Sequence, residues 1–172
     1  PRPGPAEGGK SPVVQTTFSL QIAIADGADR ILLVGLATDA PSSFGTNGAT
    51  SLVLQTANGS STLATFTKAV EGVYSTRSRC GIWYLLEADL PAAGTYRIFG
   101  TAPAGGCGWS CAKQAYAGAR QAAPLMVGPY AGSTTGTTTS ITLTNVPSDC
   151  LVFDAGSNSY EPVDVRPTGG QK

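Results

Sequence analysis

The chain has 172 residues, which suffices for one domain with a substantial core and is too short for two domains of ordinary size. Its 11 lysines and arginines balance 11 aspartates and glutamates, so it lacks the basic excess typical of nucleic-acid binders. Histidine is absent, which removes the commonest general base and metal ligand and excludes Ser-His-Asp and Cys-His catalysis. We therefore expect no enzyme activity, no cofactor and no nucleic-acid partner.

The chain also has an unusually low fraction of charged residues. Charged residues make up 13% of the chain, about half the usual share of roughly 25%, and this composition with zero net charge favours association. No apolar run reaches the roughly 18 residues of a membrane span, so no membrane partner is expected. The first residue, Pro1, fits a cleaved signal peptide, a removed initiator methionine, or a boundary within a longer chain.

Residues 1–12, PRPGPAEGGKSP, are predicted to form an extended Pro/Gly-rich arm, because they offer little to bury and disfavour regular structure. A second extended tail is predicted over 156–172, which leaves a single β-sandwich domain over 13–155. Arms of this kind can run along a neighbouring subunit. The residues expected to contact a partner in this way are Pro1, Arg2, Pro3, Pro5 and Pro12.

The domain begins with alternating and apolar segments typical of strands. Residues 13–25 alternate, with Phe18, Leu20, Ile22 and Ile24 on one face, and 30–38 (RILLVGLAT) predict a strand buried on both faces. The segments 49–56 and 62–70 flank an Asn-Gly pair and predict a hairpin.

Further strands are predicted over 80–87, 95–101, 109–118, 134–144 and 150–155. On the 109–118 strand, Trp109, Cys111 and Lys113 are expected to share a face. Eight or so short strands at fairly regular spacing predict an all-β, antiparallel β-sandwich of jelly-roll type with extended N- and C-terminal arms.

Three segments carry a resemblance: DGADRILLVGLAT, CGIWYLLEADLPAAGTY and AYAGARQAAP. Together they resemble a β-sandwich module that recurs in secreted bacterial proteins and phage structural (decoration-type) proteins, over about residues 25–155. The resemblance implies a fold, with the matching residues at core and turn positions, and implies no catalytic residues. The chain departs from the module in its Cys-rich loop and its short C-terminal portion, so the last strands are either missing or supplied by a neighbour.

The disulfide candidates are Cys80, Cys107, Cys111 and Cys150. Their spacing is a poor zinc signature and no histidine completes a site, so no metal is predicted. Cys107 and Cys111 can close the small loop CGWSC, while Cys80 and Cys150 each begin an apolar strand and could join adjacent or facing strands. Three pairings are formally open, with buried thiols and a four-cysteine zinc site as the alternatives.

These features favour a non-enzymatic structural protein that decorates or cements a virion, a phage capsid or tail, through arm-mediated packing. Its expected partners are other virion structural proteins and copies of itself, as a homo-oligomer on the virion surface. The alternative is a secreted, extracellular carbohydrate-binding or adhesive module. That alternative would use Trp109, beside the Cys loop, as a ligand-binding surface, although core packing is the more common role for such a residue.

Overall fold

The computed structural model describes residues 7–39, 51–73, 78–102, 106–125, 150 and 152–153. In this part of the chain the secondary structure is almost entirely strand. The strands are β1 (Glu7–Gln15), β2 (Thr17–Ile24), β3 (Ile31–Asp39), β4 (Ser51–Thr56), β5 (Thr62–Thr65), β6 (Thr67–Val73), β7 (Ser78–Leu86), β8 (Gly94–Thr101) and β9 (Cys107–Tyr116). A single 3-10 turn, η1 (Glu87–Asp89), follows β7. Within the described residues, no helix has the length and apolar character to cross a membrane.

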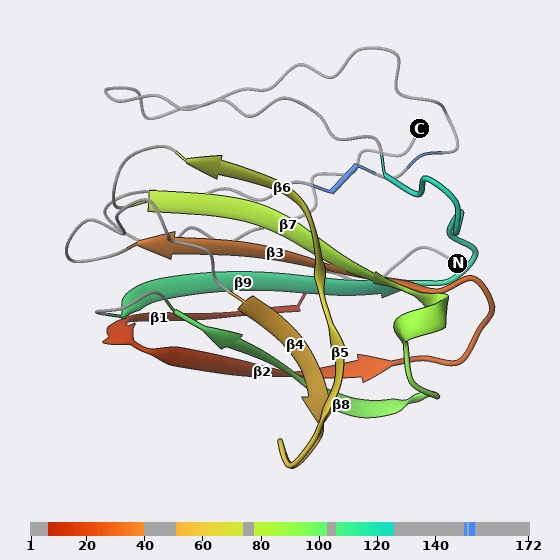
Figure 1. Ribbon diagram of the computed structural model, residues 1–172, viewed down its shortest axis with the longest axis horizontal. Helices are drawn as coiled ribbons and strands as arrows, with labels where there is room; N and C mark the ends of the chain where they lie inside the picture. The colour runs from red at the N-terminus through yellow and green to blue at the C-terminus, as the bar shows by residue number, and fades with distance from the viewer. Residues whose placement is uncertain are drawn as a thin grey trace.

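The strands form two sheets that pack face to face (Figure 1). Sheet A has five strands in the order β1-β9-β3-β7-β6, and sheet B has four in the order β2-β8-β4-β5. Every pair is antiparallel. The predicted all-β, antiparallel sandwich is therefore confirmed, whereas its jelly-roll type stays a prediction. The expected strand at 134–144 and the tail 156–172 lie outside the described residues. Of the strand expected over 150–155, residues 150, 152 and 153 are described, and none of these three is in a strand.

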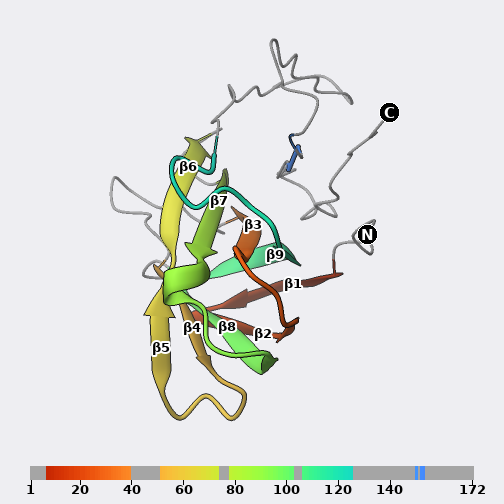
Figure 2. The same cartoon turned by 90° about the vertical axis from the view of Figure 1, so that its right-hand side faces the viewer.

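Each side of the sandwich is closed by one segment that belongs to both sheets. The segment 7–24 leaves sheet A at Thr16 and continues in sheet B, and 62–73 makes the opposite crossing at Phe66. Figure 2 shows β5 and β6 on one side of the molecule and β1 and β2 on the other. The strands predicted over 13–25 and 62–70 are each therefore two strands. At the second crossing the Phe66 ring is buried in the core. The Phe66 backbone N–H donates a hydrogen bond to the Leu52 carbonyl at 3.0 Å.

The core lies between the sheets and follows the predicted alternation. From β2 it takes Phe18, Ile22 and Ile24, with Leu20 partly buried beside them, so the predicted face of this strand is confirmed. The strand β3 is buried along almost its whole length, on both faces, as predicted from its continuous apolar run.

An aromatic pair fills the core near the β1–β2 crossing. The rings of Phe18 and Trp109 lie with centroids 4.9 Å apart and planes tilted by 30°. Gly100 stands opposite Phe18 in the register of β2 and β8, and a Cβ on Gly100 would overlap the Phe18 ring. The absent side chain thus leaves the space that the outer end of the Phe18 ring occupies over β8, a packing seen where aromatics cover strand glycines.

The tight hairpin between β4 and β5 has the predicted Asn-Gly turn. Gly59 has a φ of 75°, a left-handed conformation that favours glycine. The Asn58 side-chain oxygen accepts hydrogen bonds from Thr56 Oγ1 at 2.8 Å and from the N–H and Oγ of Ser60 at 3.1 and 2.8 Å. This turn chemistry fixes where the chain reverses.

Candidate functional site

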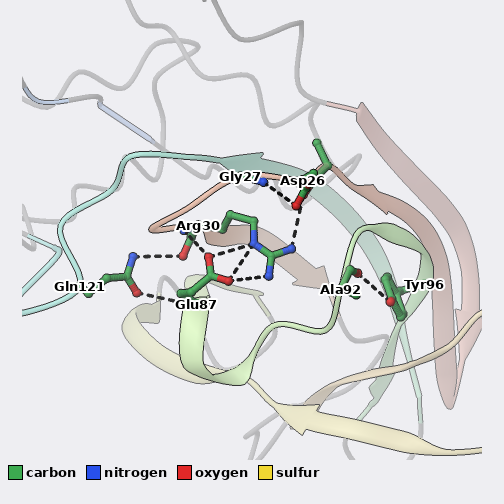
Figure 3. Close-up of polar contacts among 8 residues, drawn as sticks. Asp26, Gly27, Arg30, Glu87, Ala92, Tyr96 and Gln121 are labelled. Atoms are coloured by element: carbon green, nitrogen blue, oxygen red, sulfur yellow. Dashed lines mark hydrogen bonds and ion pairs between the residues drawn. The ribbon is translucent and has the colours of Figure 1, made fainter.

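A dense polar cluster of described residues lies at the end of the sandwich where β3 begins and β7 ends (Figure 3). Arg30, whose side chain is 9% exposed, precedes β3, and Glu87 follows β7 in η1. The Arg30 Nε donates to both Glu87 carboxylate oxygens at 3.1 and 2.9 Å, and its Nη2 donates to Oε1 at 2.6 Å. The backbone N–H of Arg30 adds a fourth bond to Oε2 at 2.8 Å.

This geometry keeps both groups charged. Side-chain and backbone hydrogen bonds from Arg30 lower the pKa of Glu87 to about 2, and the same hydrogen bond raises the pKa of Arg30. A carboxylate held in this way stays ionised at neutral pH and lacks the raised pKa of a general acid. The arrangement is thus suited to fastening two strand ends together.

Gln121 ties a third segment to this ion pair. Its Oε1 accepts the Glu87 backbone N–H at 3.0 Å, and its Nε2 donates to the carbonyls of Arg30 at 3.2 Å and Ala119 at 2.9 Å. Two backbone bonds continue the contact, from Gly118 N–H to the Ala28 carbonyl at 3.0 Å and from Ala119 N–H to the Asp29 carbonyl at 2.7 Å. We call Arg30, Glu87 and Gln121 the latch.

The latch joins the three segments on which the sequence resemblance rests: Arg30 from DGADR, Glu87 from WYLLE and Gln121 from GARQ. Sequence reasoning assigned these positions to core and turns and missed the polar network. A signal was present, because Arg30 stands just before one apolar run and Glu87 just after another. Antiparallel pairing of those runs places the two side chains together, as the register Ile31↔Leu86 does.

Trp109 is a core residue, and the prediction that places it on a ligand-binding surface is wrong. Its side chain packs against Phe18, only 7% of the residue is exposed, and its indole N–H donates to Gln15 Oε1 at 2.7 Å. A sugar needs an open aromatic face for stacking, and this ring offers none. Cys111 and Lys113 follow Trp109 at alternate positions, so the three share a face of β9 as predicted, and both are buried.

The disulfide between Cys107 and Cys111 is excluded by strand geometry. Both lie on β9 and both are buried. Four residues of extended strand span about 13 Å, whereas a disulfide needs Cα atoms within about 7 Å. The loop predicted from CGWSC is a strand because it pairs with β1 on one side and β3 on the other.

Cys80 cannot bridge to either of these cysteines. It lies on β7, which β3 separates from β9, and two strand spacings amount to roughly 9–10 Å. Among the four cysteines of the described residues no disulfide is formed, and Cys150 is exposed. The bridges that this geometry leaves open all involve Cys150, and the pairing of Cys80 with Cys150 stays a prediction.

The two β9 thiols are poor nucleophiles and poor metal ligands. Burial raises the pKa of Cys107 to about 11, with the charge of Asp39 adding to the effect. Burial raises the pKa of Cys111 to about 12, and the nearby Lys113 charge opposes this in part. Over the described ranges, no group of three or more Cys, Asp or Glu residues is arranged to hold a metal ion.

The predicted partner residues of the arm fall mostly beyond the described part of the chain. Pro1, Arg2, Pro3 and Pro5 lie outside it. Pro12 lies in β1, and residues 7–11 of the predicted arm pair as an edge strand with β9. Comparison with known proteins found no matching family model, no matching curated protein and no matching solved structure.

Proposed function

We propose that this chain is a non-enzymatic structural protein that decorates or cements a virion, a phage capsid or tail, by packing its arms on neighbouring subunits. Its partners in this proposal are other virion structural proteins and copies of itself. In support, the charged groups brought close together in the described residues are opposite charges tied to one another. These are Arg30 with Glu87, and Lys68 and Arg79 with Glu71. Such pairs of opposite charge differ from the two-carboxylate arrangement of hydrolases.

The observation that carries the proposal is the pairing of β1 on β9. Residues 7–11 of the arm follow β9 in unbroken register, from Glu7↔Lys113 to Ser11↔Trp109. β1 is an edge strand of sheet A, and the chain continues from it through Thr16 into β2 of sheet B. The β1 of a neighbouring copy would make identical pairs on β9, so an exchange of arms between subunits needs no new interface.

Composition supports the same proposal. The chain carries 11 basic and 11 acidic residues, so copies approach one another without net repulsion. The alternative, a secreted carbohydrate-binding or adhesive module, rests on Trp109. Because that ring is buried, no observation in the described residues favours it.

The test compares the full chain with a chain lacking 1–12, each added to virions of the same source from which the native protein has been stripped. We expect the truncated chain to keep the circular dichroism of a folded sandwich and to lose binding to the particle, as seen by electron microscopy. A peptide of residues 1–16 should compete with the full chain for the particle if β1 is exchanged. Equal binding by the two chains would show that the arm mechanism is wrong.

A further inference from the structure

The four edge strands of the two sheets formed by the described residues differ in how well they are protected against pairing with another chain. Edges are commonly protected by bulges, prolines, charges or short length. β6 has an irregular register between Lys68 and Val70 and carries the charge pair of Lys68 and Glu71. β5 has only four residues, and its register breaks where Leu63 has no partner on β4.

β1 is protected as well. Its register with β9 breaks between Ser11 and Gln15, and Pro12 lies within the break. A proline lacks the N–H that a further strand would need, and a bulge twists the edge away from a flat partner. Three of the four edges therefore carry a feature that opposes sheet extension.

β2 carries none of these features. All eight of its residues pair with β8 in continuous register, from Thr17↔Thr101 to Ile24↔Gly94. Its sequence, TFSLQIAI, has no charge and no proline. In the described part of the chain no strand pairs with its other edge, which lies on the side of the sandwich away from β5 (Figure 2). An edge of this length and flatness is a template for an added strand.

We propose that β2 is a self-association edge, on which the β2 of a second copy pairs antiparallel about a two-fold axis. The two B sheets then form one continuous sheet across the dimer. A two-fold axis perpendicular to the sheet keeps the two cores on the same side of the shared sheet. A core-facing residue of one β2 must therefore lie opposite a core-facing residue of the other, and an outward-facing residue opposite an outward-facing one. This condition allows Leu20 to stand opposite Leu20 of the second copy.

Leu20 selects this register. Along β2 the core-facing residues Phe18, Ile22 and Ile24 are buried, while Leu20 is only partly buried at the rim of the core. Placing the two Leu20 side chains opposite one another covers this remaining apolar surface and continues the core across the axis. Phe18 then faces Ile22 of the second copy on the inner side.

The outer face of β2 is self-complementary in the same register. Ser19 and Gln21 are exposed, and each would stand opposite the other across the axis, as small or uncharged polar neighbours that cross-strand pairs accept. The contact is limited to one strand per subunit and is therefore small. We expect a dimer with Kd on the order of tens of micromolar, which many-copy assembly would strengthen through effective concentration.

This inference adds a self-contact to the proposed function but does not depend on it, because arm exchange uses sheet A and β2 belongs to sheet B. The test measures self-association of the full chain by sedimentation velocity over a concentration series. The variant Ser19→Lys/Gln21→Lys places like charges opposite one another across the axis, and Ser19→Glu/Gln21→Glu does the same with the opposite sign. The control is Thr62→Lys/Thr65→Lys, which adds the same charge to exposed positions of the protected edge β5.

We expect the unaltered chain and the β5 control to dimerise equally, and each β2 variant alone to bind itself at least tenfold more weakly. An equimolar mixture of the two β2 variants should restore dimerisation, because opposite charges then face one another. A chain that stays monomeric up to millimolar concentration, or a dimer that both β2 variants leave unchanged, would overturn the proposal. The dimer should persist in the chain lacking 1–12, which separates this result from that of the arm test.

Discussion

Arg30 and Glu87 lie at the adjoining ends of β3 and β7, each next to a residue of the cross-strand pair Ile31↔Leu86. Their side chains form a bidentate ion pair that links the two strands. The Arg30 side chain is largely buried, and its guanidinium reaches the carboxylate with two nitrogens. Planar forks of this kind fix geometry as well as charge. The central strand of sheet A, β3, and its neighbour β7 are thereby held in one register at this end.

Replacing Glu87 with glutamine should lower the thermal unfolding temperature at neutral pH by several degrees. The folded-state pKa of Glu87 is about 2, below its ordinary value of 4.5, because Arg30 donates to the ionised form. The stabilisation is therefore fully present above about 4.5 and is lost as pH falls through about 2. Melting curves of both proteins across this range should converge at the acid end.

The matched control is Asp89→Asn, which neutralises an exposed carboxylate in the same 3-10 turn. This variant should have the same thermal unfolding temperature as the unaltered chain at every pH. If Glu87→Gln shows the same difference in melting temperature at pH 2 as at pH 7, the ion pair does not stabilise the fold in the way described.

Replacing Gln121 with alanine should free the segment 117–123 without unfolding the sandwich. Three hydrogen bonds are lost, to Glu87, Arg30 and Ala119, at a cost of about 1–3 kcal/mol in the free energy of unfolding. Hydrogen exchange should speed up at the amides of Gly118 and Ala119, whose bonds fasten this segment to the 28–29 turn. Arg120→Ala, at an exposed neighbouring position, should leave these amides protected.

The fold class and several burial patterns could be predicted because they follow from local periodicity. The alternation of Phe18, Leu20, Ile22 and Ile24 predicts which face of β2 packs on the core. The unbroken apolar run of β3 indicates burial on both faces. The Asn58-Gly59 turn carries its own geometry, since glycine supplies the positive φ. Each of these signals is contained in a few consecutive residues.

The features that escaped prediction depend on partners distant in sequence. Thr16 and Phe66, where the chain changes sheets, are flanked by ordinary strand residues, so nothing local marks a crossing. The latch requires the register of β3 on β7, and the Cys107 and Cys111 pairing failed because β9 is extended between β1 and β3. The side chain of Trp109 likewise needs Phe18 and Gln15, 91 and 94 positions earlier, to explain its burial.

The cysteine geometry predicts at most one disulfide in the native protein. Intact mass spectrometry of the air-oxidised protein should show a mass lower than that of the reduced chain by no more than two hydrogens. Iodoacetamide at neutral pH should modify the exposed Cys150 in reduced, folded protein and spare Cys107 and Cys111, whose thiols are buried with pKa values of about 11 and 12. After unfolding, both should react. A deficit of four hydrogens would contradict the extended geometry of β9.

Replacing Trp109 with alanine should cost about 3–5 kcal/mol of unfolding free energy, the usual range for removing a large aromatic side chain from a core. The loss has two parts, since the ring packs on Phe18 and its N–H satisfies Gln15. Trp109→Phe keeps most of the packing and removes the hydrogen bond to the exposed Gln15, so it should cost only about 0.5–1.5 kcal/mol. Urea unfolding followed by circular dichroism gives both values. A surface role would give the opposite pattern, with little change in stability for either variant, because an exposed ring has few contacts to lose.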